Sequence, residues 1–250
     1  MAKESGLGAR LFVAGLNYSG DVGQLQAIGG GMTVQDTTPI DKLAMARIGL
    51  LRDGRIEYTA FWNPDGVHPS LAALPTADQP VAYYHRAAIG APAAAMVGKQ
   101  IGYDPTRNQD GSLTAGIQAL ANGFGLEWGQ ALTAGAQQLT PGVPNGTGLD
   151  YGATVGTTLF GLQAYLHVLA FVGTGVALSI QHSDDDGAVD PYVDVPGAVF
   201  SQVTAAPGSQ RLQTDRDQAV KRWLRVAAAG TFTSVDVAVV VVKNRAEVIF

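Results

Sequence analysis

The chain has 250 residues, of which 46% are hydrophobic and 15% are charged, and its formal net charge is −5. Duplex binding requires a basic surface, so this acidic balance argues against a nucleic-acid-binding protein. The sequence contains no cysteine, which excludes disulfides, cysteine-ligated zinc and thiol catalysis. The 32 glycines and the apolar content predict one or two packed, turn-rich β domains.

The first strands are expected close to the start of the chain. Residues 9–13 predict a short strand. Residues 22–28 and 32–37 predict a hairpin arm that turns around Gly29, Gly30 and Gly31.

Alternating strands and turn signals continue to about residue 132. Arg52, Asp53 and Gly54 predict a turn, and residues 55–62 then alternate as a half-buried strand does. Residues 112–119 alternate in the same way. The turn signal Asn122-Gly123 predicts a further strand over residues 124–132.

Two short helical pieces interrupt the strands. Pro69 suits a first helical turn and Pro75 cannot continue one, so the sequence predicts a helix over residues 68–74. Residues 42–47 predict one or two further helical turns. Both pieces are too short to be stable alone and are expected to pack against a sheet.

Proline and glycine without an apolar period predict a linker at residues 141–156. The expected division is therefore a first domain at 1–140 and a second β-sandwich at 157–250. The apolar stretch at residues 159–172 alternates, which predicts a half-buried strand and not a membrane span. Further strands are expected at residues 176–181, 198–204, 221–227 and 234–243.

The residue patterns predict no catalytic, cofactor-binding or metal-binding site. The four histidines, His68, His85, His167 and His182, form no metal-binding motif. The acidic turn at residues 184–187 has oxygen ligands suited to calcium but lacks the terminal glutamate of a calcium loop, so a solvated hairpin loop is favoured. Three tryptophans predict core or interface anchors, with a sugar-binding face as the alternative: Trp62, Trp128 and Trp223.

Residues 8–135 resemble the major tail tube proteins of long-tailed, siphovirus-type bacteriophages. The resemblance rests on the strand and turn at 11–21, the long segment 29–51, the R-D-G at 52–54 and the I-E-Y-T-A-F-W-N-P at 56–64, followed by the short helix from His68. It implies a tail-tube-like β-sandwich or barrel with a flanking helix. Residues 157–250 look like an added antiparallel β-sandwich, immunoglobulin-like or jelly-roll-like.

The resemblance also implies a function without enzymatic activity. Family members form hexameric rings that stack into a tube, the conduit for DNA ejection, and a long loop of each subunit contacts the next ring. The expected contact loop here contains Gly29, Gly30, Gly31, Asp41, Arg47, Arg52 and Asp53.

Implied partners are further copies of the chain, the tape measure and tail terminator proteins, and DNA in non-specific transit. The implied location is the virion tail, after assembly in the host cytoplasm. The alternative is a virion decoration or adhesion protein whose second sandwich binds a host-surface glycan. A small hydrolase has the least support, because the sequence carries no activated nucleophile or metal set.

Overall fold

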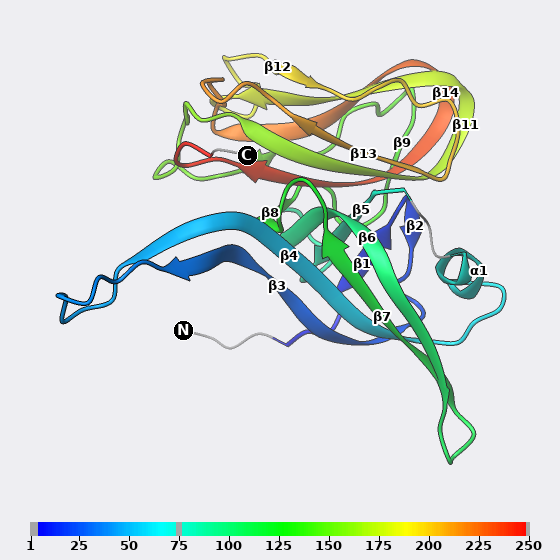
Figure 1. Ribbon diagram of the computed structural model, residues 1–250. Coiled ribbons are helices and arrows are strands. Elements are labelled where there is room, and N and C mark those ends of the chain that lie inside the picture. The colour runs from blue at the N-terminus through cyan, green and yellow to red at the C-terminus, as the bar shows by residue number, and fades with distance from the viewer. Residues whose placement is uncertain (1–4, 74–76, 249–250) are drawn as a thin grey trace. The chain divides into compact units, whose positions relative to one another are not determined.

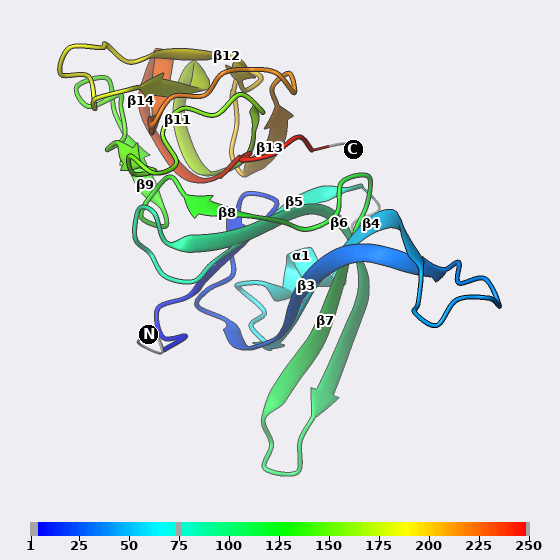
Figure 2. The same cartoon turned by 90° about the vertical axis from the view of Figure 1, so that its left-hand side faces the viewer.

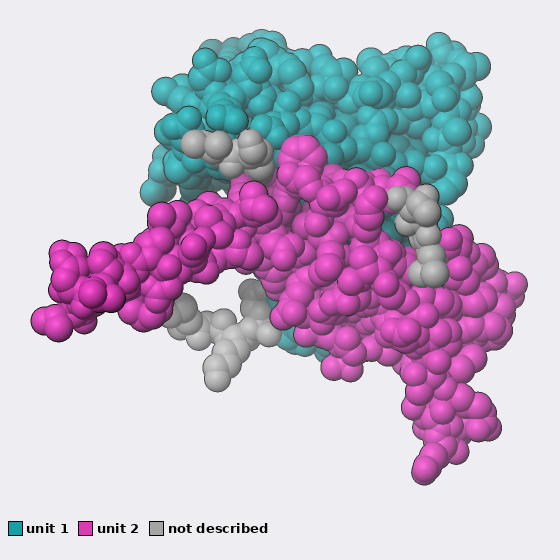
Figure 3. Space-filling model, in the orientation of Figure 1, with its two compact units in different colours: residues 1–20, 79–95, 128–250 teal, residues 21–78, 96–127 magenta. Residues whose placement is uncertain are grey.

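The computed structural model describes residues 5–73 and 77–248. Its regular structure is almost entirely β-strand, which confirms the mainly β fold expected from the sequence. The chain divides into two compact units, coloured separately in Figure 3. Unit 1 comprises residues 1–20, 79–95 and 128–250, and unit 2 comprises residues 21–78 and 96–127.

Unit 1 is a β-sandwich built around two long antiparallel strands, β11 (Leu162–Ser183) and β14 (Trp223–Lys243), which pair along their whole length (Figure 1). Smaller strands extend this pair. They are β1 (Arg10–Val13), β2 (Leu16–Asn17), β5 (Gln79–Tyr84), the start of β6 (Pro92–Arg107), β8 (Glu127–Ala131), β9 (Gln137–Leu139), β10 (Leu149–Asp150), β12 (Val193–Val199) and β13 (Gly208–Gln213).

The two long strands bend back on themselves at glycines and thereby form both layers. The β11–β14 register shifts on either side of Gly173. A Cβ at Gly173 would lie 2.5 Å from Phe232 Cα, and one at Gly230 would lie 2.4 Å from the Gly175 carbonyl oxygen. Only glycine allows backbones to approach so closely, so these residues place the bend. Figure 2 shows the curvature.

The inward faces of both layers form one hydrophobic core. Leu166 and Val239 come from one half of the strand pair, and Leu178 and Val226 come from the other, and all four are fully buried in the same cluster. The sequence predicted four strands at residues 159–172, 176–181, 221–227 and 234–243. The structure instead has two strands, because a glycine bend preserves the hydrogen-bonded pairing that a turn would end.

Both faces of β11 are buried over residues 162–168, contrary to the expectation of a half-buried strand. Gln163, Tyr165 and His167 alternate with the core residues but have almost no exposure. Gly15, in the turn between β1 and β2, donates its backbone N–H to His167 Nδ1 at 3.2 Å, and the Phe12 ring lies 6.0 Å from the imidazole. The alternation of apolar and polar residues identified the two faces of this strand. It did not reveal that other strands cover the polar face.

The expected linker at residues 141–156 lies inside unit 1. Leu149 and Asp150 form β10 against β14, and Asn145 bridges to Ala227. The observed units therefore differ from the division into 1–140 and 157–250. Proline and glycine content marked irregular backbone, but it did not indicate whether that backbone packs onto a sheet.

Unit 2 contains β3 (Val22–Asp36), β4 (Arg47–Phe61), α1 (His68–Ala72), the remainder of β6 and β7 (Leu113–Ala121). Its buried face comes from β4 and β7, which pair with Tyr58 opposite Ile117 and Ala60 opposite Ala115. These residues are the apolar positions of the two alternating segments at 55–62 and 112–119, so both alternations are confirmed.

The short helix is also present, with Pro69 in its first turn and Leu71 buried. Its expected end at Pro75 lies outside the described residues. Across the described ranges, no helix has the length and apolar character that crossing a bilayer would require.

Candidate functional site

Strands β3 and β4 form a long two-stranded arm on unit 2 (Figures 1 and 2). Their register runs from Val22 opposite Ala60 to Asp36 opposite Arg47. Strand β7 pairs with β4 only from Arg55 to Phe61. In the described chain, the distal part of the arm is therefore two strands with both outer edges unpaired. Figure 3 shows it as a narrow projection of unit 2.

Local hydrogen bonds close the tip of the arm. The Thr37 N–H donates to the Ala46 carbonyl at 2.9 Å, and the Ala46 N–H donates to Thr38 Oγ1 at 2.8 Å. The Thr38 hydroxyl and N–H both donate to Asp36 Oδ1, and the hydroxyl bond is the main reason that the pKa of Asp36 is lowered. Polar residues at the tip thus fix the strand register, as expected for Asx-type turn chemistry.

The distal arm exposes apolar side chains on both strands and at the tip. Ile40 and Leu43 are fully exposed, and Leu51 is 81% exposed. The other exposed large apolar residues of the arm are Met32, Val34, Met45, Ile48 and Leu50. Scattered exposed apolar residues are ordinary, but eight on one two-stranded projection form an unusually apolar surface.

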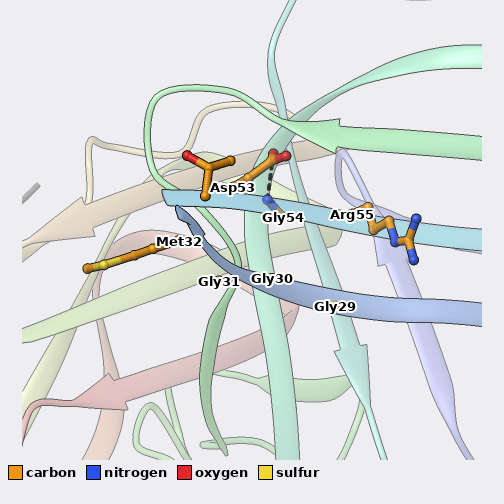
Figure 4. Close-up of a pocket in the computed structure, with 8 residues that line it drawn as sticks. Gly29, Gly30, Gly31, Met32, Asp53, Gly54 and Arg55 are labelled. Atoms are coloured by element: carbon orange, nitrogen blue, oxygen red, sulfur yellow. Dashed lines mark hydrogen bonds between the residues drawn. The ribbon is translucent and has the colours of Figure 1, made fainter. Parts of the chain in front are cut away.

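A shallow hollow of about 360 Å³ lies on the arm where the three glycines meet β4 (Figure 4). Gly29, Gly30 and Gly31 lie opposite Arg55, Gly54 and Asp53 in the register. Asp53 Oδ1 accepts the Gly54 N–H at 2.7 Å, so this carboxylate is held beside the strand. A Cβ at Gly29 or Gly31 would meet no atom within 4 Å, so the face of the strand at these two glycines is open.

The structure brings most of the expected contact residues together and separates two of them. Gly29, Gly30, Gly31 and Asp53 line the hollow, and Arg52 precedes Asp53 on β4, opposite Met32. Arg47 lies at the far end of the paired strands, and Asp41 lies in the tip. At about 3.3 Å per residue, the five residue steps from Gly31 to Asp36 span roughly 17 Å.

Three expectations about this segment were wrong. The glycines are not a hairpin turn but lie within the continuous strand β3, and Arg52-Asp53-Gly54 is part of β4. Residues 42–47 form no helix in the described chain, and Arg47 begins a strand. The turn is the polar tip at 37–46. Sequence analysis did not single out the exposed apolar residues between Met32 and Leu51. This segment is rich in apolar residues, but they recur with neither the period of a helix nor that of a strand.

The acidic turn at residues 184–187 is occupied by its own hydrogen bonds. The Asp185 carboxylate accepts N–H groups from Ala188, Val189 and Asp190, and Asp190 pairs with Lys221 at 2.7 Å. Within the residues that the structure describes, no group of three histidine or acidic side chains is arranged to hold a metal ion.

No known protein family matches the sequence, and no curated protein matches it. Among solved structures, the chain is similar to the Dit (gp 19.1) protein of phage SPP1, described as a paradigm of the hub adsorption apparatus in phages that infect Gram-positive bacteria. The identity is 10%, the TM-score is 0.34, and the alignment covers 94% of this chain and 99% of the phage protein. A TM-score this low establishes neither a shared fold nor a function.

Proposed function

We propose that this chain is a structural protein of a phage particle that assembles with copies of itself through the β3–β4 arm. In the finer form of the proposal, the copies form stacked, hexameric rings of a tail tube. The exposed apolar arm is the observation that carries the proposal, and the resemblance of residues 8–135 to tail tube proteins supplies the form of the assembly.

The energetics of the arm favour an assembled state. An isolated two-stranded hairpin is marginally stable in water. The distal arm also exposes two open strand edges, which a monomeric protein ordinarily protects because they pair with other chains. A neighbouring subunit would supply strand pairing for the edges and burial for side chains such as Ile40 and Leu43. Each buried side chain of this size contributes about 1.5–3 kcal/mol.

Another copy of this chain is the simplest partner. Every copy carries the same open edges and the same glycine hollow, so a single contact can be repeated around a ring. If the rotation that relates neighbouring copies brings the last copy into contact with the first, the result is a closed ring. A head-to-tail contact that does not close in this way gives a filament or tube. The role is non-enzymatic, and the tape measure protein, the tail terminator and passing DNA are partners of the tube and not of the isolated subunit.

The test is analytical ultracentrifugation and negative-stain electron microscopy of the purified chain over a concentration series. We expect rings or hollow tubes for the natural sequence. The double substitution Ile40→Asp and Leu43→Asp places charge on the arm tip without touching the core, so we expect monomers with an unchanged melting temperature and circular dichroism spectrum.

A matched control substitutes exposed apolar residues outside the arm. Val143→Asp with Val189→Asp changes two exposed residues of unit 1 in the same way, and this variant should assemble as the natural chain does. Assembly by the arm variant at the natural concentration would show that the arm is not the contact. A monomer at every concentration, together with no tubes in particles that contain the protein, would contradict the proposed function.

A further inference from the structure

Unit 1 contains a pocket of about 380 Å³ that the assembly proposal does not use. It is lined by Trp128, Gly129 and Gln130 from β8, by Tyr151, and by Lys243 and Arg245 at the end of β14 and just beyond it. The pocket therefore combines two aromatic rings, an amide and two cationic side chains, all from one unit.

The fold presents Trp128 to solvent at the edge of this pocket. Strand β8 pairs with β14 through Gln130 opposite Val241 and Ala131 opposite Val240. A Cβ at Gly129 would lie 2.3 Å from the Val241 carbonyl oxygen, so glycine is required for the strands to approach. Glu127 and Ala131 are buried, but Trp128 is 56% exposed. An exposed indole at a pocket provides a flat apolar face for a ligand ring.

Two cationic side chains line the pocket, and Asp184 and Asp150 act on Lys243 only through longer-range electrostatics. Lys243 is buried, and its Nζ donates to the carbonyls of Gly156 and Lys221 at 2.6 Å and lies 4.9 Å from the centre of the Tyr151 ring. Burial lowers the pKa of Lys243 to about 8, so the ammonium is mainly charged at neutral pH. In the described part of the chain, neither Lys243 nor Arg245 forms an ion pair.

An unused acceptor completes the set of ligand-binding groups. The Oε1 atom of Gln130 is buried and has no hydrogen-bond partner among the described residues. A buried acceptor without a partner is unfavourable, so a ligand hydroxyl that reaches Gln130 would gain a hydrogen bond. The pocket thus offers a stacking face, an acceptor for a hydroxyl group and a positive charge.

We propose that this pocket binds a sugar that carries an acidic group, such as a uronic acid or a sugar phosphate. The sugar ring packs on Trp128, a ring hydroxyl donates to Gln130, and the acidic group lies against Arg245 in the positive field of Lys243. A neutral sugar would use the first two contacts only, and a bare anion only the third, so selectivity requires both parts of the ligand.

The test uses the full chain and follows tryptophan fluorescence and isothermal titration calorimetry at pH 7. The probes are a disaccharide with one glucuronate unit, the matching neutral disaccharide of glucose, glucose 6-phosphate, inorganic phosphate and uridine monophosphate. We expect saturable binding of the glucuronate disaccharide and of glucose 6-phosphate. The affinity for the neutral disaccharide should be lower by a factor of about ten or more.

Variants separate the two halves of the site. Trp128→Ala should abolish binding of both acidic sugars, and Arg245→Gln should lower their affinity to that of the neutral disaccharide. Trp62→Ala removes a partly exposed tryptophan of unit 2 and should bind as the natural chain does.

Three outcomes would overturn the proposal. They are no saturable signal from either acidic sugar, unchanged binding by Trp128→Ala, and equal or tighter binding of phosphate or of uridine monophosphate. None of these measurements depends on self-assembly, so the pocket and the arm can fail independently.

Discussion

Gly30 and Gly54 lie directly opposite each other in the β3–β4 arm, and Leu126 lies against both of them. A Cβ at Gly30 would lie 2.7 Å from Leu126 Cβ, and one at Gly54 would lie 2.5 Å from the Leu126 backbone nitrogen. The Leu126 N–H donates to the Asp53 carbonyl at 3.4 Å. The glycine pair therefore lets the base of the arm lie against the chain at Leu126, which anchors the arm within unit 2.

Replacing Gly54 by alanine should destabilise the protein. The new methyl group would meet backbone atoms of Leu126, which cannot move aside as a flexible side chain can, so we expect a loss of about 1–3 kcal/mol in the free energy of unfolding. Denaturation in urea measures this loss.

Gly31→Ala is the matched control, because a Cβ there has no atom within 4 Å. It should be neutral or slightly stabilising, through a smaller loss of backbone entropy on folding. Equal effects of the two substitutions would contradict a steric role for Gly54.

The sequence predicted the parts of the fold in which one face is buried and the other is exposed. Ile56, Tyr58 and Ala60 on β4, and Ala115 and Ile117 on β7, alternate with polar neighbours and form the buried face of unit 2. This pattern is local, since a strand covered on one side records its burial in its own residues.

Long-range features were not predictable in the same way. Gly173 and Gly230 resemble turn glycines in the sequence, but each lies at a bend within a paired strand. Gln163 and His167 read as an exposed face, because nothing local shows that β1, β2 and β5 cover it. In the candidate site, the three glycines were interpreted as a turn, since the strand pairing that surrounds them depends on Arg52 to Arg55 across the arm.

Assembly should protect the arm tip from proteolysis. Lys42 is exposed in the tip, between the two strands. In the monomeric range of concentration, brief trypsin treatment should cut after Lys42, because loop tips of this kind are preferred sites of cleavage. In assembled material the same bond should be cut at least about tenfold more slowly if a neighbouring subunit covers the tip.

Mass spectrometry of the early fragments identifies the bond that is cut, and Lys42→Gln provides the control. Equal cleavage rates in monomer and assembly would place the tip outside the subunit contact, even if the protein forms rings.

The buried hydroxyl of Thr133 should contribute measurably to the stability of unit 1. It donates to the Gly135 carbonyl at 2.8 Å and accepts the Val239 N–H at 3.0 Å. Thr133→Val preserves the shape but leaves two backbone groups without a partner, so we expect a loss of about 1–3 kcal/mol in the free energy of unfolding. Thr174→Val, at an exposed hydroxyl that donates to the Thr231 carbonyl, should change stability by less than about 0.5 kcal/mol. If the two substitutions lower the free energy of unfolding by similar amounts, the Gly135 carbonyl and the Val239 N–H must find other hydrogen-bond partners in the Thr133→Val variant.

Acid should weaken unit 1 through His167 well before the carboxylates titrate. This imidazole is fully buried, and burial lowers its pKa from 6.5 to about 3. Between these two values the unfolded state binds a proton that the folded state does not, so stability is complete above pH 6.5 and falls as the pH is lowered towards 3. The slope that one such group can contribute is about 1.4 kcal/mol per pH unit.

Urea denaturation at pH 7, 6, 5 and 4.5 measures this slope, and this range lies above the titration of Asp185 and Asp190, whose pKa values are lowered. In His167→Asn, the side-chain oxygen can still accept the Gly15 N–H, but there is no group to protonate. The variant should be less stable than the natural chain at pH 7, with a shallower dependence on pH.

Burial also lowers the pKa of His182, so His182→Asn is made in parallel to subtract its smaller contribution of the same sign. Parallel curves for the natural chain and His167→Asn would show that acid acts on unit 1 through groups other than this histidine.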